Sequence, residues 1–263
     1  MTIALFPESA PMKLLRDTGL IYVRSLMLTL RNPVWVFIGL SQPILYLALF
    51  APLLDPIAST PGFPGGGALN VFVPGLLVQL AMFSAFTGFG LIAELRAGVV
   101  ERMRVTPISR VAMLLGRALR DVTILLVQAA LIILCALPFG LRIAPSGFVV
   151  ALILLALVGL IMTTFSYSVA LAVKSEDVLA PVINAIFLPV LLLSGVLLPM
   201  SLAPRWLQWV AALNPLSHAV DAMRSLFAGA VVNGTVALGV VLMLALALVS
   251  LFFAARAFAQ SQA

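Results

Sequence analysis

Six runs of apolar residues, each long enough to cross a bilayer, dominate this chain. They cover roughly residues 34–54, 71–93, 121–140, 147–173, 178–199 and 235–255. A helix needs about 20 residues to cross the hydrocarbon core, because each residue adds about 1.5 Å. Only a helix pairs all backbone polar groups within one such run, and the alternation typical of barrel strands is missing. The sequence therefore predicts an all-α integral membrane protein with six transmembrane helices.

The composition agrees with this prediction. Hydrophobic residues make up 63% of the 263 residues and charged residues only 9%, whereas about a quarter of a soluble domain is charged. No polar stretch is long enough to fold separately, so residues 1–263 are expected to form a single transmembrane domain. The net charge of +6 does not indicate a nucleic-acid partner, because the basic residues lie beside the apolar runs.

The basic residues also predict the orientation. With the N-terminus inside, twelve of the fifteen Lys and Arg residues fall on the inner side of the membrane. Cytoplasmic loops are enriched in Lys and Arg, so both termini are predicted to be cytoplasmic.

Residues 11–31 are too charged to span. Asp17, Arg24 and Arg31 recur every seven residues and share one helical face, whereas Ile21 and Tyr22 lie on other faces. This pattern predicts an amphipathic helix in the membrane interface, with its basic edge towards lipid phosphates.

The external connection at 199–230 has short apolar patches interrupted by Pro204 and Pro215. Tryptophan prefers the headgroup level, and two tryptophans here lie three residues apart on one helical face. A re-entrant segment is predicted. Its marked residues are Trp206, Trp209, Asn214, His218, Asp221 and Arg224.

Within that segment, His218, Asp221 and Arg224 follow one another at intervals of three residues. Neighbours at this spacing on a helix form hydrogen bonds or ion pairs, so a local structural clasp is predicted. A catalytic dyad of His218 and Asp221, in a membrane-embedded enzyme, is the alternative.

The chain is expected to draw its energy from another protein. A phosphate-binding Gly-rich loop ending in Lys-Ser/Thr is missing from the sequence, so the chain itself is not expected to hydrolyse ATP. Each acidic residue is predicted to fall at or beyond the end of a span, which argues against coupling to an ion gradient. No catalytic, cofactor-binding or metal-binding residues are predicted.

Uncharged polar residues do occur inside the spans. Taken singly, each is expected to make an interhelical hydrogen bond worth about 1 kcal/mol or less. Taken together, these residues are candidates for a translocation path. The candidates are Gln42, Gln79, Gln128, Thr164, Tyr167 and Asn184. Small residues are expected to allow close helix packing at Ser84, Gly88, Ser194 and Gly195.

Charged side chains crowd into residues 94–110, which read ELRAGVVERMRVTPISR. Glu94, Gly98 and Glu101 are expected near one helical edge, Thr106-Pro107 ends that helix, and a new helix begins near Ser109. The segment is either a solvated loop or a short charged helix that a soluble partner holds between two spans.

The order of these residues resembles a known family. Glu-x-x-x-Gly-x-x-Glu, then VTPISR and LLGR, is similar to the cytoplasmic segment of type-2 ABC transporter permeases. Residues 187–227 resemble that family's LSG, Pro-x-Trp and LNP-x-x-x-x-V-D-x-x-R motifs. The nearest branch is the bacterial drug-efflux permeases of the daunorubicin-resistance kind.

This resemblance implies a permease subunit of an ATP-driven exporter in the bacterial plasma membrane. Two copies, as a homodimer, would bind two separate ATPase subunits that hold ATP and Mg. The coupling segment 94–110 would contact the ATPase, and a hydrophobic, drug-like compound would be exported, as in antibiotic resistance. By this resemblance the coupling residues are Glu94, Arg96, Gly98, Glu101, Arg102 and Arg104.

Three alternatives remain open at this stage. A lipid or polysaccharide exporter would use much the same chain. A membrane scaffold would recruit a cytoplasmic protein through residues 94–110 without transport. The membrane-embedded enzyme would use His218 and Asp221.

Overall fold

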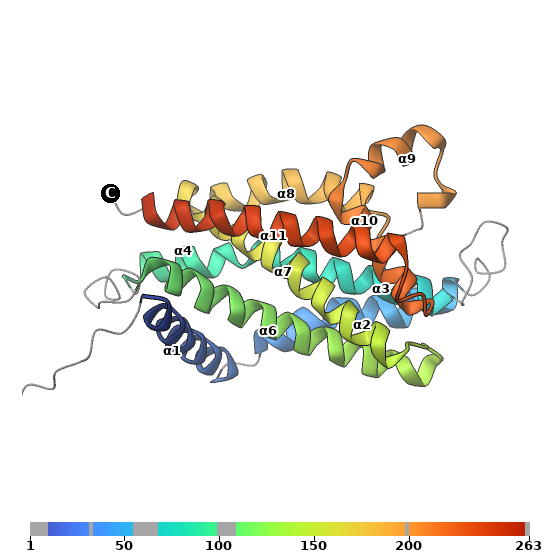
Figure 1. The fold of residues 1–263 in the computed structure, drawn as a ribbon, viewed down its shortest axis with the longest axis horizontal. Helices are drawn as coiled ribbons and strands as arrows, with labels where there is room; N and C mark the ends of the chain where they lie inside the picture. The colour runs from blue at the N-terminus through green and yellow to red at the C-terminus, as the bar shows by residue number, and fades with distance from the viewer. Residues whose placement is uncertain (1–9, 32–33, 55–67, 99–108, 198–199, 261–263) are drawn as a thin grey trace, which may run out of the picture.

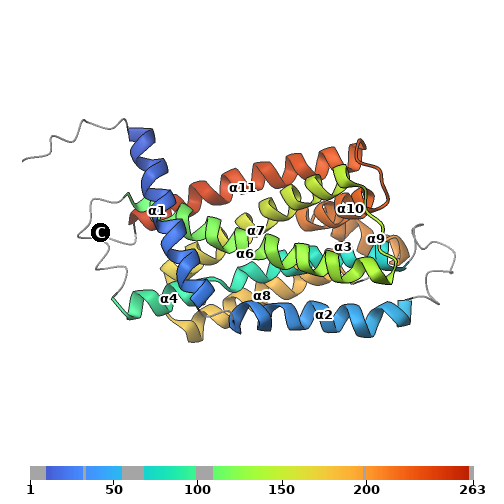
Figure 2. The same cartoon turned by 90° about the horizontal axis from the view of Figure 1, so that it is seen from below.

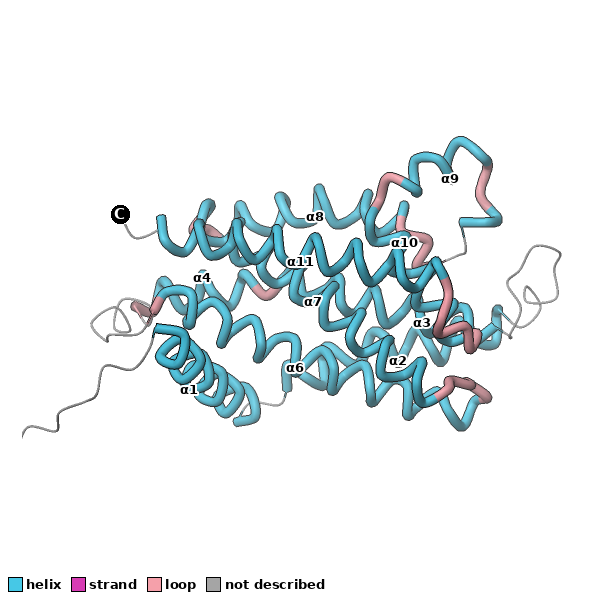
Figure 3. The backbone as a smooth tube through the Cα atoms, viewed as in Figure 1, coloured by secondary structure: helices cyan, strands magenta, loops and turns pink. Residues whose placement is uncertain are grey.

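The computed structural model describes residues 10–31, 34–54, 68–98, 109–197 and 200–260, and these residues form helices and turns without a strand (Figure 3). The described α-helices are α1 (Ala10–Arg31), α2 (Val34–Leu54), α3 (Ala68–Met82), α4 (Gly88–Arg96), α6 (Arg110–Ala136), α7 (Pro145–Val173), α8 (Glu176–Leu193), α9 (Arg205–Ala212), α10 (Pro215–Phe227) and α11 (Gly234–Gln260). Three short 3-10 turns are η2 (Phe83–Phe86), η3 (Leu137–Phe139) and η4 (Met200–Leu202).

Five stretches of helix among the described residues are long and apolar enough to cross a membrane. They are Leu69–Arg96, Val111–Phe139, Pro145–Val173, Glu176–Leu193 and Gly234–Phe258. The prediction of an all-helical membrane protein is confirmed. The first predicted span, 34–54, forms the helix α2 but is not one of these five.

Helix α7 lies at the centre of the bundle, where it contacts α3, α4, α6, α8, α10 and α11. Helices α2 and α11 lie on opposite sides of it (Figure 2). One end of the bundle carries α1, the end of α4 and the C-terminal end of α11, and is called the α1 end (Figure 1). The opposite end, which carries α9, is called the α9 end.

The second span is broken rather than straight. Helix α3 gives way to the 3-10 turn η2, and α4 resumes at Gly88. The Gly88 N–H donates a hydrogen bond of 2.8 Å to the Ser166 hydroxyl of α7. A Cβ added at Gly88 would lie 2.7 Å from that hydroxyl oxygen, so the predicted close packing at this glycine is confirmed. The last part of the span, α4, is therefore a separate short helix fixed against α7.

Helix α1 packs along α6, where a Cβ added at Gly116 would lie 2.7 Å from the Ile21 side chain. Arg24 and Arg31 are exposed, as the predicted basic edge requires, but Asp17 is buried. The three residues share one helical face, as predicted, but that face is covered at Asp17 and exposed at Arg24 and Arg31. A helix that crosses another at an angle contacts it over only part of its length, so residues seven apart have different surroundings.

Helix α10 lies inside the bundle at the α9 end, in contact with α3, α7 and α11. Glycines make this possible: a Cβ added at Gly147 of α7 would lie 2.9 Å from the Leu226 carbonyl oxygen. By contrast, α9 is exposed.

A turn at Gly195, which has a positive φ, helps to hold the helices together at the α9 end. Gly195 has a φ of 73°, and its carbonyl accepts a hydrogen bond of 2.7 Å from the Arg224 guanidinium. The same guanidinium donates to the Val71 carbonyl at 3.1 Å. Arg224 thus ties α10 to the start of α3 and to the turn after α8.

We predict that Gly195→Ala lowers the free energy of unfolding by about 1–2 kcal/mol, because a side chain at this left-handed φ is strained. The measurement is thermal unfolding of the purified chain in detergent. Gly234→Ala is the control, because an added Cβ there meets nothing within 4 Å. Equal melting temperatures for the two variants would contradict this account of the turn.

Candidate functional site

Helix α4 is held by two ion pairs at the α1 end. The Glu94 carboxylate accepts a hydrogen bond of 2.5 Å from the Arg117 guanidinium of α6. The Arg96 guanidinium lies 3.2 Å from the Glu176 carboxylate, in the first turn of α8. One short helix is therefore tied to two neighbouring spans through consecutive charges on its last turn.

The two ion pairs differ in burial. The Arg117 side chain is 3% exposed, whereas the Arg96 side chain is 56% exposed. Ion pairs in contact with water contribute little to stability, and a buried charge that loses its partner is costly. The Glu94–Arg117 pair is therefore the stronger constraint on the position of α4.

Gly98 ends α4. It has a φ of 66°, and its N–H donates to the Leu95 carbonyl, as in a glycine C-cap. The expectation that Glu94, Gly98 and Glu101 share the edge of one continuous helix is therefore wrong, because the helix stops before Gly98. Glu101, Arg102 and Arg104 lie outside the described residues. The predicted helix start is confirmed, since the Ser109 hydroxyl caps α6 by accepting from the Ala112 N–H at 3.0 Å.

A second charged group lies deeper, on α6. The Arg120 Nε lies 2.8 Å from the Asp121 carboxylate, which also accepts a hydrogen bond from the Tyr167 hydroxyl of α7. Asp121 is buried and lies ten residues inside the candidate span Val111–Phe139. The predicted third span begins at residue 121, but the helix that carries Asp121 begins eleven residues earlier, at Arg110. Within the protein, Arg120 and Tyr167 compensate the Asp121 charge.

Helix α1 also contacts this group. The Tyr22 and Thr123 hydroxyls lie 3.2 Å apart, and the Arg120 guanidinium donates to the Thr29 hydroxyl at 3.4 Å. A displacement of α6 between residues 117 and 123 would therefore also displace α1, α4 and α7.

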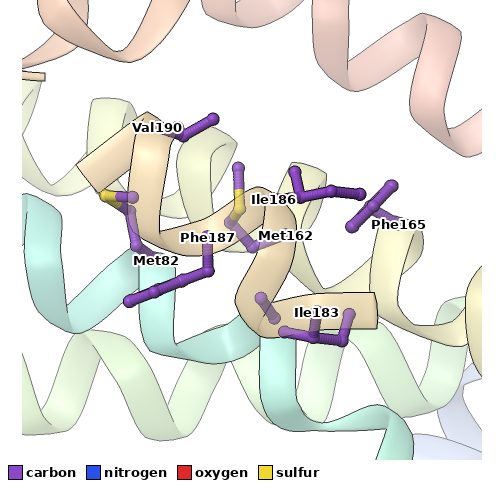
Figure 4. A pocket seen from close by; sticks show the side chains of 8 residues that line it. Met82, Met162, Phe165, Ile183, Ile186, Phe187 and Val190 are labelled. Atoms are coloured by element: carbon purple, nitrogen blue, oxygen red, sulfur yellow. The ribbon is translucent and has the colours of Figure 1, made fainter. Parts of the chain in front are cut away.

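An apolar cavity of about 140 Å³ lies where the second span breaks (Figure 4). Its walls come from the α3–η2 junction, α7 and α8, and contain no polar side chain. They are Met82, Ala85, Met162, Phe165, Ile183, Ile186, Phe187 and Val190. The Phe187 ring lies 5.3 Å from that of Phe83 and 5.4 Å from that of Phe86, measured between centroids. Such a cavity accepts an apolar or aromatic group, not an ion.

A larger and more polar cavity, of about 320 Å³, lies between α2, the α3–η2–α4 break and α6. Its walls include Asp121 and Gln128 of α6. Of the two cavities, this one has a predicted path residue, Gln128, in its wall.

The remaining predicted path residues are dispersed. The Thr164 hydroxyl makes a hydrogen bond of 3.0 Å to the Ser250 hydroxyl of α11, and Gln79 is buried in α3. The Asn184 amide donates to a carbonyl of its own helix and is exposed. Gln42 lies in α2, and its side chain is outside the described residues. The five side chains that the structure describes do not all line one of these two cavities.

The residues of the external segment have separate roles. Trp206 and Trp209 are exposed on α9. Asn214 caps α10 by accepting from the Leu216 N–H, and its amide donates to the Val190 carbonyl at the end of α8. The side chain of Asn214 thus joins two helices.

The predicted clasp at 218–224 is wrong in its pairing. His218 contacts the Ala212 carbonyl at 3.1 Å, and Arg224 donates to the backbone carbonyls described above instead of to Asp221. Burial lowers the pKa of Arg224 to about 10, and the nearby Asp221 carboxylate acts in the opposite direction. Since His218 and Asp221 share no hydrogen bond among the described contacts, the structure provides no catalytic dyad.

Comparisons with known proteins now identify the family. The pattern of the ABC-2 type transporter family matches residues 16–228. A protein from Cyanophora paradoxa described as a transport permease, ycf38, is 31% identical over 204 residues, which cover 75% of this chain and 69% of the relative. The daunorubicin resistance ABC transporter permease protein DrrB1 of Streptomyces coeruleorubidus is 27% identical over 241 residues, covering 87% and 80%. The chain belongs to the ABC-2 type transporter family.

Family membership settles the broad class. The chain is a multi-pass membrane protein of a transport permease family, whose permease chains have no ATPase of their own and typically work with an ATPase partner. The resemblance read from the motifs at 94–117 and 187–227 is confirmed.

Sequence reasoning missed Arg117, Arg120 and Asp121 as a structural group. The signal was present: these residues are spaced three and one apart, from the Arg of a Gly-Arg pair onwards, on a helix predicted to begin near Ser109. Treating charge as the mark of a span end placed them before the third span, and their mutual contacts were not predicted.

We predict that Arg117→Met lowers the free energy of unfolding by about 2 kcal/mol, because it leaves the Glu94 carboxylate half-buried without its partner. Arg96→Met removes the exposed ion pair of the same helix and should cost less than about 1 kcal/mol. Thermal unfolding in detergent measures both. Similar losses for the two variants would show that burial does not distinguish these pairs.

Proposed function

We propose that this chain is the membrane subunit of an ATP-driven exporter that moves a hydrophobic or amphipathic, drug-like compound out across the bacterial plasma membrane. The observation that carries the proposal is the attachment of α4. The start of the coupling segment is fixed to α6 and α8 by ion pairs and to α7 through Gly88, so force applied to this segment would reach four spans.

The topology proposed here has six spans, with α2 as the first, and both termini in the cytoplasm. Helix α2 has 21 residues and no charged side chain. At the α1 end lie most of the basic residues, which favours this end as the cytoplasmic one. Helix α1 would then lie at the inner surface, and α9 and α10 would form the external re-entrant segment.

Two copies of the chain with two copies of a separate ATPase would form the working assembly. ATP and Mg²⁺ would be bound by the ATPase. In the proposed cycle, closure of the ATPases pushes on the coupling segments, and α4 transmits this displacement to the spans. Coupling requires only that ATP binds the two arrangements with different affinities.

We predict that reversing the charges of Glu101 and Arg102 uncouples transport. If the coupling segment contacts the ATPase there, substrate-stimulated ATP hydrolysis by the reconstituted complex should fall about tenfold, while the fold stays intact. Arg256→Glu is the control, because Arg256 is exposed at the same end on α11. Unchanged stimulation in the double reversal would refute the contact.

The apolar cavity at the α3–η2 break supports a hydrophobic substrate. It adjoins the junction at which α4 would move, so movement of α4 and binding in the cavity would be linked. The daunorubicin-resistance relative favours an aromatic drug, whereas lipid export by the same chain is the alternative.

We predict that Phe187→Leu lowers the transport of daunorubicin about tenfold, because aromatic contacts contribute about 0.5–1.5 kcal/mol each. The measurement is ATP-dependent uptake into inverted vesicles. Phe253→Leu is the matched control, since Phe253 is exposed on the lipid-facing side of α11. If both variants transport the drug like the wild type, the cavity does not lie on its route.

A further inference from the structure

The cavity between α2, the α3–η2–α4 break and α6 has the properties of a second binding site. Its polar side chains are Asp121, Gln128, Ser84 and Thr87, and its apolar ones are Ile38, Leu80, Phe83, Ile124 and Leu125, with Gly39 between them. An ionisable side chain inside a membrane span that faces a cavity marks a functional site unless another role explains it. Here the volume of about 320 Å³ suffices for a polar head with part of an apolar body.

The cavity lies beside a helix that is long and apolar enough to cross a membrane. Asp121 lies ten residues from the start of the candidate span at Val111, and Gln128 seventeen residues from it. At about 1.5 Å per residue, these positions are about 15 and 26 Å along the helix. The cavity therefore extends from the inner third of the span to near its middle.

The cavity opens beside α2, on an exposed side of the bundle. Ile38, on α2, is 54% exposed, whereas Leu125 and Leu80 on the opposite wall are buried. A molecule entering past α2 could keep its apolar tail in the bilayer while its head reaches Asp121 and Thr87.

The groups at the inner wall favour a head that donates hydrogen bonds. One Asp121 oxygen accepts a hydrogen bond from Tyr167 and the other lies 2.8 Å from the Arg120 Nε, whereas a carboxylate has about four acceptor positions. The Thr87 hydroxyl uses its proton on the Ser84 carbonyl at 2.9 Å, so its lone pairs remain for a donor. Asp121 is also the one charged side chain on the described walls of the cavity.

We propose that this cavity binds the primary ammonium head of an amphipathic molecule that enters from the inner leaflet. Asp121 and Thr87 accept its hydrogen bonds, and Ile124, Leu125 and Phe83 contact its apolar body. The proposal rests on the exporter function, to which it adds a substrate class and an entry site distinct from the all-apolar cavity beside Phe187.

The test is equilibrium binding to the full chain in phosphatidylcholine nanodiscs, with empty nanodiscs subtracted. Three fluorescent amphiphiles with the same dodecyl body carry a primary ammonium, a trimethylammonium or a hydroxyl head. The wild type should bind the primary ammonium at least about tenfold more tightly than the trimethylammonium, which has no N–H donor, and more tightly than the alcohol, which has no charge. Equal affinities for the ammonium and either of the other probes would overturn the proposed head group.

Two variants locate the site without disturbing Asp121. Ile124→Phe fills the cavity, whereas Ile153→Phe places the same ring on an exposed position of α7. We expect the dissociation constant of the ammonium probe to rise at least about tenfold in Ile124→Phe and to stay unchanged in Ile153→Phe. Gln128→Leu should weaken binding as well, with Gln79→Leu, buried away from the cavity, as its control.

Melting temperatures of the four variants verify that each is folded. Wild-type affinity in both Ile124→Phe and Gln128→Leu would overturn the site. Since this binding requires neither ATPase nor nucleotide, failure of the exporter function would appear separately, as a complex that binds the amine but transports nothing.

Discussion

Charge inside a membrane protein must be compensated within the protein, and this requirement organises the α1 end of the bundle. Arg117 is almost fully buried, and the acidic partner within its reach is Glu94 of α4. That pair fixes a nine-residue helix which would otherwise be only the frayed end of a broken span. The neighbouring Arg120–Asp121–Tyr167 group then connects α6 to α7, and α1 packs over both charged turns of α6.

The same constraint explains why the second span is broken where it is. A continuous helix through residues 83–87 would turn α4 about its axis and carry Glu94 and Arg96 away from α6 and α8. The 3-10 turn η2 changes the direction of the chain, and the Ser166 hydroxyl satisfies the Gly88 N–H freed there. Both cavities that matter for the proposed function adjoin this break.

Much of this architecture could be predicted from the sequence. Long apolar runs predicted the helices, Ser109 predicted the start of α6, and the motifs at both ends predicted the family. The ion pairs could not be predicted, because Glu94 and Arg117 are 23 residues apart and Arg96 and Glu176 are 80 apart. Hydropathy alone also placed the start of α6 too late, since it treats a charged turn as the end of a helix.

At the α9 end, the motif residues proved to be structural. Arg224 was expected to pair with Asp221, but it donates to two backbone carbonyls from different segments. Buried backbone carbonyls are costly when they are unpaired. One arginine has enough donors to satisfy both carbonyls at once, whereas an ion pair with Asp221 would leave them unpaired. These contacts hold α10 inside the bundle.

The central claim, that this chain works through a separate ATPase held at the coupling segment, is tested most directly by purifying it from its native membranes in mild detergent and sequencing whatever chain comes with it. The account predicts a partner with a Gly-x-x-x-x-Gly-Lys-Ser/Thr loop that hydrolyses ATP. A chain that purifies alone, or with a partner that binds no nucleotide, would contradict it.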